Sequence, residues 1–287
     1  MLNNKIHIFF KIVHVLLIST YFNQLLAQKS IVLRKEIENS EQYNSEEINF
    51  IDTEDNTLLS GTFIFPKTEY SKIVIITPGS GKDTRNSHYK LAEELLKNNI
   101  GVYRFDDRGV GKSGGTVNFS VDQIIRDLYC VYKNIRTIHS LSNKNIGILG
   151  HSLGGIAAIE NHQKGINPDF IILLSTPVEK YGKFKNPQFS SKNNNSKSKV
   201  SALNIFENID IPLLFIAGTN DTFFNTEKTI NLINALNNKK INTTSLKGLD
   251  HFLTKGKDDW KQTKDYHSIY EIDKTAVDTI VKWIQKT

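Results

Sequence analysis

The sequence has 287 residues, of which 39% are hydrophobic and 23% are charged. This composition is typical of globular proteins and excludes collagen, coiled coil and general disorder as descriptions of the whole chain. Cys130 is the only cysteine, which excludes an internal disulfide and a cysteine-based zinc cluster. The formal net charge is +6, but Lys and Arg are scattered among Asp and Glu, so we expect no nucleic-acid binding.

The first residues have the features of a secretory signal peptide. Residues 1–27 contain Lys5 and Lys11 but no acidic residue, a short apolar run at 12–18 and a small residue, Ala27, at their end. The apolar run is shorter than the ~20 residues that a membrane-spanning helix needs. We therefore expect an exported protein, periplasmic or secreted, with no stable membrane insertion after the peptide is removed. A retained membrane anchor is the alternative, because Leu25 fits the cleavage site poorly.

Strands and helices alternate along the rest of the chain, after a polar lead-in at 28–45. Apolar or β-branched runs predict strands at 48–52, 58–65, 73–77, 101–105, 145–149, 170–174, 212–217 and 242–246. Helical periodicity predicts helices at 88–98, 121–136, 153–163, 226–237 and 274–285. The first two strands suggest a hairpin, and the later ones are typical of buried parallel strands. Residues 46–287 should form one α/β domain, with a mostly parallel eight-stranded sheet and helices on both faces.

One stretch interrupts this alternation. Residues 181–200 are rich in Lys, Asn and Ser and have no apolar periodicity, which predicts a surface loop. The loop falls within residues 176–211, which we interpret as a short insertion into the domain.

Two strings have the pattern G-x-S-x-G, one around Ser113 and one around Ser152. In a nucleophile elbow the serine follows a strand and precedes a helix, and the sharp turn exposes its hydroxyl. Ser152 has the predicted strand 145–149 before it and the predicted helix 153–163 after it. Ser113 follows a polar stretch and precedes a non-helical one. The context therefore predicts Ser152 as a nucleophile, against a structural serine in a tight turn.

A serine hydroxyl needs a general base, and the base needs an acid to orient it. Asp221 follows the predicted strand 212–217, and His251 follows the strand 242–246, which gives the chain order serine, acid, histidine. Asp221 could instead cap the next helix. Glu179 is the alternative acid, and His267 and His88 are the alternative bases. His151 is excluded as the base, because its position alternates with that of its neighbour Ser152 and points its side chain the other way.

The tetrahedral intermediate of acyl transfer needs main-chain N–H donors around its oxyanion. Leu153, directly after the nucleophile, should supply one donor. Ser80, in the glycine-rich segment 78–81 after the third strand, should supply the other, although this segment could be an ordinary turn. Cys130 lies at helical spacing with apolar residues, which indicates a buried thiol and not a nucleophile.

Taken together and in order, these segments resemble the α/β-hydrolase superfamily. More narrowly, they resemble secreted bacterial esterases of the serine aminopeptidase-like kind, and the resemblance runs from about residue 46 to the end of the chain. The matching segments are 78–81 with Asp83 and Arg85, 103–113, 150–155, 218–221 and 250–251. The resemblance implies ester or thioester hydrolysis through an acyl-enzyme, with Asp107 and Arg108 as structural residues. The chain departs from its relatives in the reduced lid at 176–211, which puts the identity of the substrate in doubt.

We therefore expect a serine hydrolase that acts on a small ester or acyl substrate. Ser152, Asp221 and His251 would be catalytic, and Ser80 and Leu153 would form the oxyanion hole. No metal or organic cofactor is implied. A nucleotide-binding phosphate loop is excluded because Asp106 occupies the position of its first glycine. A peptidase or aminopeptidase and a catalytically silent binding protein are the alternatives, and the sequence leaves the oligomeric state open.

Overall fold

The structure of the chain is a computed structural model that describes residues 37–118, 120–178, 202–255 and 268–287. All of these residues lie in the unit Lys35–Thr287. The expected signal peptide at 1–27 and the Lys-, Asn- and Ser-rich stretch at 181–200 lie outside the described residues, as do Glu179 and His267.

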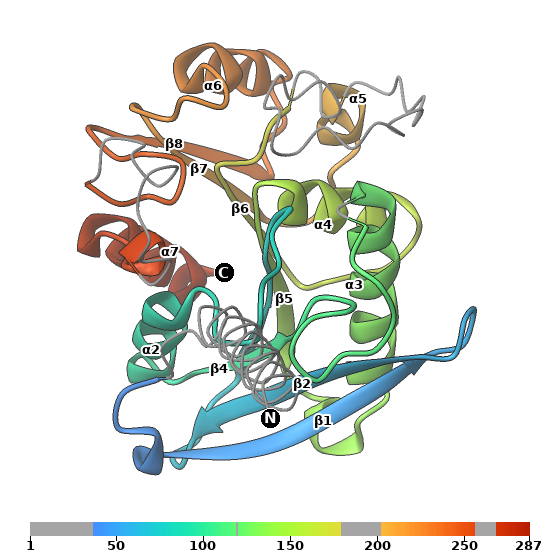
Figure 1. The fold of residues 1–287 in the computed structure, drawn as a ribbon. Helices are drawn as coiled ribbons and strands as arrows, with labels where there is room; N and C mark the ends of the chain where they lie inside the picture. The colour runs from blue at the N-terminus through green and yellow to red at the C-terminus, as the bar shows by residue number, and fades with distance from the viewer. Residues whose placement is uncertain (1–36, 119, 179–201, 256–267) are drawn as a thin grey trace, which may run out of the picture. The chain divides into compact units, whose positions relative to one another are not determined.

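Eight strands form one sheet with the order β1-β2-β4-β3-β5-β6-β7-β8 (Figure 1). The strands are β1 (Tyr43–Asp52), β2 (Thr57–Pro66), β3 (Lys72–Thr77), β4 (Ile100–Phe105), β5 (Asn145–His151), β6 (Ile171–Leu174), β7 (Leu213–Gly218) and β8 (Ile241–Leu246). The β1–β2 and β2–β4 pairs are antiparallel, and all other pairs are parallel. The predicted mostly parallel sheet and its leading hairpin are confirmed.

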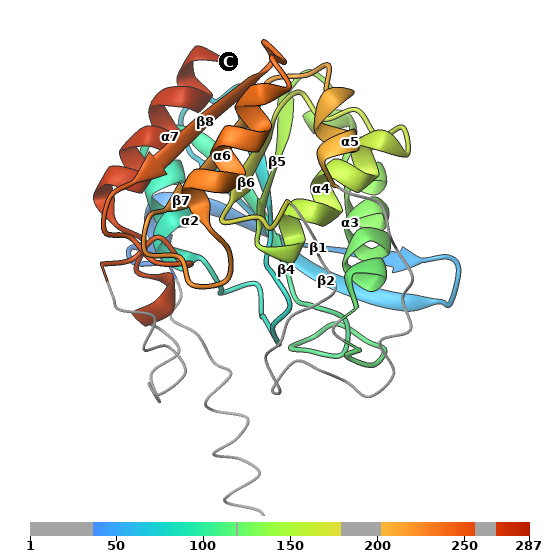
Figure 2. The same ribbon diagram turned by 90° about the horizontal axis from the view of Figure 1, so that it is seen from above.

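Helices cover both faces of the sheet, as the doubly wound pattern predicts (Figure 2). They are α2 (Tyr89–Lys97), α3 (Val121–Ile135), α4 (Leu153–Gln163), α5 (Ala202–Glu207), α6 (Thr226–Ala235) and α7 (Lys274–Lys286). Apolar residues of α2 and α7 pack with alternate residues of the central strands. Apolar residues of α3, α4, α5 and α6 pack with the other set. Each strand thus contributes side chains to two hydrophobic layers.

Two elements differ from the sequence-based expectations. Strand β1 begins at Tyr43, inside the segment expected as a lead-in, and most of its residues are at least partly exposed. An edge strand that faces solvent has little apolar signal, which explains the short prediction. Helix α5 lies in the expected insertion and buries Ala202, Ile205 and Phe206. Its 6 residues are too few to produce a recognisable helical period.

The topology places the candidate residues at one edge of the sheet. Loops leave the carboxyl ends of the parallel strands at this edge, where ligands bind in open α/β sheets. Ser80 follows β3, Ser152 follows β5, Asp221 follows β7 and His251 follows β8. The fold therefore gathers residues that are far apart in the chain.

Candidate active site

Ser152 lies between the end of β5 and the start of α4, in the strand–turn–helix context that the sequence predicted. Its main chain has φ 53° and ψ −120°, a conformation that side-chain-bearing residues rarely adopt. Its main-chain N–H donates to the carbonyl of Leu174 at 2.8 Å, and its carbonyl accepts from Gly155 at 3.0 Å. The turn is thus held on both sides in a strained conformation, as a nucleophile elbow requires.

Glycines around the turn allow the close approach of neighbouring main chain. A methyl group on Gly154 would collide with the carbonyl oxygens of Thr77 and Pro78 at the end of β3. A methyl group on Gly79 would lie 3.1 Å from Cβ and 3.7 Å from Oγ of Ser152. The two glycines bring the start of α4 and the loop after β3 into direct contact beside the serine.

His251 and Asp221 form a buried hydrogen-bonded pair. Nδ1 of His251 lies 2.8 Å from Oδ2 of Asp221, and the two side chains are 3% and 0% exposed. The other carboxylate oxygen of Asp221 accepts from the N–H of Phe223 at 2.8 Å. An ionised carboxylate can only accept, so Nδ1 of His251 carries the hydrogen and donates it. This tautomer leaves Nε2 of His251 available as an acceptor.

Three hydrogen bonds and one ring contact hold the loop that carries His251. The carboxylate of Asp250 accepts from the N–H of Phe252 at 3.0 Å, from the N–H of Thr254 at 2.9 Å and from the hydroxyl of Thr254 at 2.8 Å. The ring of Phe223 stacks on the imidazole of His251 with their centroids 4.1 Å apart. The imidazole is therefore fixed by its loop and by a neighbouring ring.

His151 lies much closer to His251 than strand alternation suggested. Its ring centroid is 5.0 Å from that of His251, and its Nε2 lies 3.0 Å from the main-chain oxygen of His251. The sequence excluded His151 only as the base, and the structure adds that its ring contacts the loop of His251. Burial, and then the nearby His251 and His88, hold the pKa of His151 well below its usual value. The ring is neutral, and Nε2 donates to the carbonyl, which can only accept.

Ser113, in the second G-x-S-x-G string, and His88, the alternative base, both lie buried within the fold. The hydroxyl of Ser113 accepts from the N–H of Ser60 at 2.9 Å and donates to the carbonyl of Asp106 at 2.8 Å, and Ser113 is buried. His88 is buried beside Tyr270, with its ring 5.1 Å from that of His151. The described contacts join neither residue to Asp221.

The loop after β3, which contains Ser80, is tied to the loop after β4. The N–H of Asp83 donates to the carboxylate of Asp107 at 2.8 Å, and the N–H of Asp107 donates to the carbonyl of Asp83 at 2.9 Å. The hydroxyl of Tyr270 donates to the carboxylate of Asp83 at 2.6 Å. These bonds position the glycine-rich segment beside Ser152 and agree with the structural role that the resemblance implied for Asp107.

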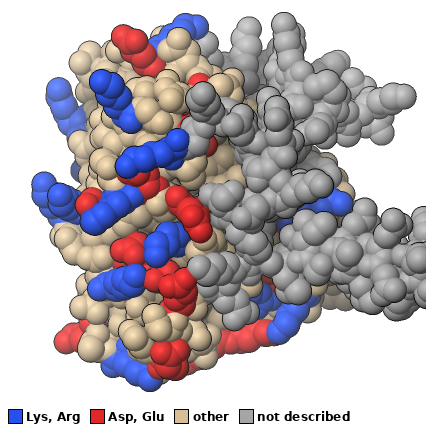
Figure 3. All heavy atoms as spheres, turned by 60° about the vertical axis from the view of Figure 1, so that its left-hand side comes forward, with Lys and Arg blue, Asp and Glu red and all other residues tan. Residues whose placement is uncertain are grey.

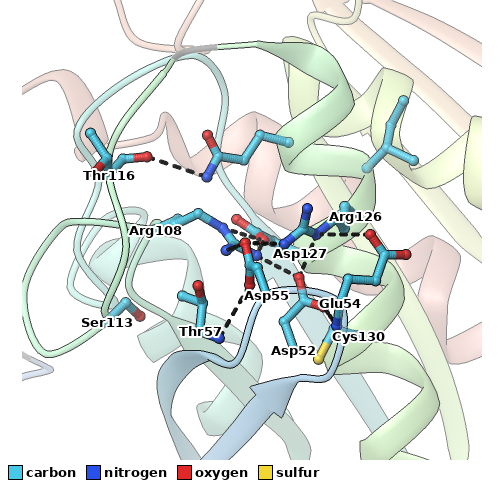
Figure 4. Close-up of polar contacts among 12 residues, drawn as sticks. Asp52, Glu54, Asp55, Thr57, Arg108, Ser113, Thr116, Arg126, Asp127 and Cys130 are labelled. Atoms are coloured by element: carbon cyan, nitrogen blue, oxygen red, sulfur yellow. Dashed lines mark hydrogen bonds and ion pairs between the residues drawn. The ribbon is translucent and has the colours of Figure 1, made fainter.

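Arg108 lies at the centre of a buried ion-pair network (Figure 4). Its guanidinium contacts the carboxylates of Asp52, Asp55 and Asp127, each at 2.6 Å. The Arg108 side chain is 5% exposed. Burial raises the pKa of Asp127 above its usual value in spite of the bonds from Arg108. The network joins the β1–β2 turn, the loop after β4 and helix α3, which is the structural role that the resemblance implied.

Arg85 supports the same loop from the other side. Its guanidinium contacts the carboxylate of Asp106 at 2.8 Å and donates to the hydroxyl of Thr62 at 2.8 Å. Asp106 also accepts from the main-chain N–H groups of Arg85 at 2.7 Å and Lys112 at 2.8 Å. Asp106, which stands where a phosphate loop would have its first glycine, thus holds the loop after β4 together through its carboxylate.

Within residues 37–118, 120–178, 202–255 and 268–287, no group of three or more His, Cys, Asp or Glu side chains could hold a metal ion. No helix in the same part of the chain has the length and apolarity needed to cross a membrane. On the face drawn in Figure 3, Lys and Arg side chains are interspersed with Asp and Glu.

Comparison with known proteins shows similarity between this chain and hydrolases. Residues 68–193 match the family described as "Serine aminopeptidase, S33". The chain is 30% identical over 94 residues to protein phosphatase methylesterase 1 of Candida albicans, covering 33% of this chain and 25% of that protein. It is 27% identical over 184 residues to the uncharacterized protein YfhR of Salmonella typhi, covering 58% of this chain and 61% of YfhR. The chain thus spans less than two thirds of either relative.

Solved structures share the fold. The Pyrococcus furiosus esterase Pf2001 superimposes with a TM-score of 0.64 at 22% sequence identity, covering 88% of this chain and 97% of that chain. At this identity the likeness concerns the fold.

Proposed function

We propose that this chain is a serine hydrolase of the α/β-hydrolase superfamily in which Ser152, His251 and Asp221 form a catalytic triad. The bond of 2.8 Å between His251 and Asp221 is the observation that carries the proposal. It joins the loops after β7 and β8 at the sheet edge where Ser152 occupies its strained turn. A buried carboxylate that fixes the tautomer of a histidine is what a general base needs.

The reaction follows from these positions. Oγ of Ser152 attacks the substrate carbonyl carbon while Nε2 of His251 takes the hydroxyl proton. The carbonyl oxygen becomes an oxyanion, which accepts hydrogen bonds from the main-chain N–H groups of Ser80 and Leu153. The intermediate then expels the leaving group, which receives the proton from His251. Water then attacks the acyl-enzyme while Nε2 of His251 takes its proton. His251 returns this proton to Oγ of Ser152 as the acid is released.

We propose a carboxylic ester or thioester of a small acid as the substrate. Pf2001 is named an esterase, and the Candida albicans relative is named a methylesterase. The description of the matched family names an aminopeptidase, which makes a serine peptidase the second candidate. Both activities use the same three side chains, so the choice between them depends on the substrate and not on the triad.

The test compares substrates and serine variants of the purified protein. We expect turnover of p-nitrophenyl acetate or butyrate, and covalent labelling of Ser152 by a fluorophosphonate. Ser152→Ala should remove the label and lower kcat by about 10³-fold or more. Turnover of aminoacyl anilides without turnover of esters favours the peptidase. A protein with neither turnover nor label contradicts the proposal and supports a silent binding protein.

Ser113→Ala is the matched control, because Ser113 occupies the second G-x-S-x-G string. Its hydroxyl is bonded on both sides within the fold. We expect lower thermal stability but full labelling per folded molecule. Loss of labelling in a folded Ser113→Ala protein would mean that Ser113, and not Ser152, is the nucleophile.

We further propose that the protein is exported, because residues 1–27 have the pattern of a signal peptide. Expression in a bacterial host followed by fractionation tests this. We expect a shortened protein outside the cytoplasm. A full-length protein in the cytoplasm contradicts the proposal, and one held in the membrane fraction indicates a retained anchor.

A further inference from the structure

A cavity lies beside the segment that carries Ser80, between the sheet and the start of α3. It is lined by the ends of β3 and β4, the loop 79–81 and the residues around the start of α3. The lining residues used below are Thr77, Gly79, Ser80, Phe105, Gln123 and Ile124. Of these residues, only Ser80 takes part in the reaction steps described above, through its main-chain N–H.

Thr77 is the unexplained group in its wall. Thr77 is fully buried, and its hydroxyl oxygen has no hydrogen-bond partner in the structure. Such a group is costly, because a buried hydroxyl without a partner loses its hydrogen bonds to water, about 1–3 kcal/mol. An unsatisfied hydroxyl in a cavity wall points to a missing polar partner.

Strand alternation directs this hydroxyl toward the cavity. Ile73 and Ile75 belong to the hydrophobic layer on the α3 side of β3, and Ile76 belongs to the opposite layer. Side chains at every second position share a face, so Thr77 lies on the α3 side with Ile73 and Ile75. Phe105 and Ile124, which line the cavity, belong to the same layer.

The cavity adjoins the reacting serine. Gly79 lines it, and the same glycine lies against Ser152, where an added methyl group would be 3.7 Å from Oγ. Ser80, whose N–H would bond the oxyanion, also lines it. A substrate carbonyl held by Ser80 and Leu153 would therefore lie next to the cavity, because Ser80 itself lines it.

The positions of the proposed base and of the cavity decide which part of the substrate faces it. His251 must protonate the leaving group, and it reaches the site from the β7–β8 side of Ser152. The cavity lies on the other side, at the ends of β3 and β4. The two substituents of the carbonyl carbon extend in different directions, so the acyl group faces the cavity.

The size of the cavity limits the acyl group. It leaves about 30 Å³ for the centre of a water molecule to occupy. About 10–15 Å³ of such volume is enough for one water. The space therefore suits two or three non-hydrogen atoms beyond the carbonyl, and the rest of a long alkyl chain would have to extend out of the pocket into solvent.

We propose that this cavity is the acyl-binding pocket and that it selects short acyl groups with a hydroxyl, which bonds to the hydroxyl of Thr77. The wall also contains the half-buried carboxamide of Gln123, which donates to the carbonyl of Thr116 at 3.4 Å, and the charged side chains of Asp107, Arg108 and Asp127. This proposal rests on the serine hydrolase function proposed above. A hydroxyacetyl group fits both the volume and the unsatisfied oxygen.

The experiment compares p-nitrophenyl glycolate, propionate and octanoate with the full chain and its Thr77 variants. Glycolate and propionate differ by a hydroxyl in place of a methyl group, and valine replaces the threonine hydroxyl with a methyl group of similar shape. We expect Thr77→Val to lower the glycolate-to-propionate ratio of kcat/KM about ten-fold or more. Thr77→Ser should keep the ratio within about three-fold, because it keeps the hydroxyl. Octanoate should be the poorest substrate.

Three outcomes decide the matter. The remote variant Thr279→Val, on helix α7, controls for nonspecific effects and should leave both rates unchanged. A ratio that Thr77→Val leaves unchanged, while esters are still turned over at Ser152, overturns the acyl pocket alone and indicates that water fills the cavity. Efficient turnover of octanoate overturns it as well. A protein that hydrolyses no ester and takes no fluorophosphonate overturns both this proposal and the proposed function.

Discussion

The imidazole of His151 donates a hydrogen bond of 3.0 Å to the main-chain carbonyl of His251, a residue 100 positions later in the chain. The last residue of β5 therefore anchors the loop of the proposed base, and the proposed nucleophile, Ser152, directly follows it. Within this arrangement His151 is a positioning residue, since its hydrogen bond is to the main chain of His251.

We predict that His151→Phe lowers kcat while KM changes little. Phenylalanine keeps a ring but removes the donor, so the buried carbonyl of His251 loses its partner. A shift of the base by about 1 Å can lower a rate by about 100-fold. We expect kcat to fall between ten- and a hundred-fold by these magnitudes, with KM within about three-fold. Steady-state kinetics with a p-nitrophenyl ester measures both parameters.

His151→Gln is the conservative control, because glutamine keeps an N–H donor. We expect it to recover a large part of the lost kcat. A His151→Phe protein with the activity of the unchanged enzyme would contradict the positioning role. Equal losses in both variants would show that ring packing, and not the hydrogen bond, supports the site.

The same histidine should make the protein sensitive to acid. Burial holds the pKa of His151 well below 6.5 in the folded state, whereas the unfolded chain takes up a proton near that pH. The contribution of the neutral His151 ring to the free energy of unfolding is complete above pH 6.5. It is lost as the pH falls from 6.5 toward the pKa of His151 in the folded state. The loss approaches about 1.4 kcal/mol per pH unit. Urea unfolding from pH 7 to pH 5 should give a shallower pH slope for His151→Gln than for the unchanged protein. Identical slopes would mean that His151 titrates alike in both states.

The Arg108 network predicts a large loss of stability for Arg108→Met. The substitution leaves the buried carboxylates of Asp52 and Asp127 without their shared cation. Removing one partner of a buried ion pair typically lowers the free energy of unfolding by about 3–5 kcal/mol. The loss should be smaller near pH 4.5, because protonation neutralises the abandoned carboxylates. Urea unfolding at both pH values measures the effect.

Arg126→Met is the control for this prediction. Arg126 also contacts Asp52, but its side chain is 34% exposed, so solvent screens the interaction. We expect a loss of about 1 kcal/mol or less. Equal losses in the two variants would contradict the central role of Arg108.

Cys130 should react slowly with thiol reagents in the folded protein. The residue is 8% exposed, and burial raises the pKa of its thiol to about 11. The thiolate is the reacting form, so only a small fraction is reactive at pH 8. Ellman's reagent should modify the native protein at least about a hundred-fold more slowly than the protein in urea. Rapid modification at native conditions would mean that helix α3 opens readily.

Much of the site follows from local sequence. Residues 145–163 combine a β-branched strand, a G-x-S-x-G turn and a helix without help from distant residues, and the structure has each part there. The chain order of Ser152, Asp221 and His251 places each one after a predicted strand, and strand ends of a parallel sheet share an edge. Local periodicity thus predicts the strands and helices, and their order predicts that the three residues meet at the carboxyl ends of the parallel strands.

The sequence by itself determined the alternation of strands and helices, the elbow at Ser152 and the side of the sheet where the site lies, because these depend on neighbours in the chain. Only the tertiary structure decided that His151 bonds to His251, that Arg108 gathers carboxylates from β1, its turn and α3, and that the hydroxyl of Thr77 lies buried without a partner. Periodicity reports which face a side chain occupies. The residue that it meets there depends on strand order and loop paths, which join parts of the chain that no local pattern connects.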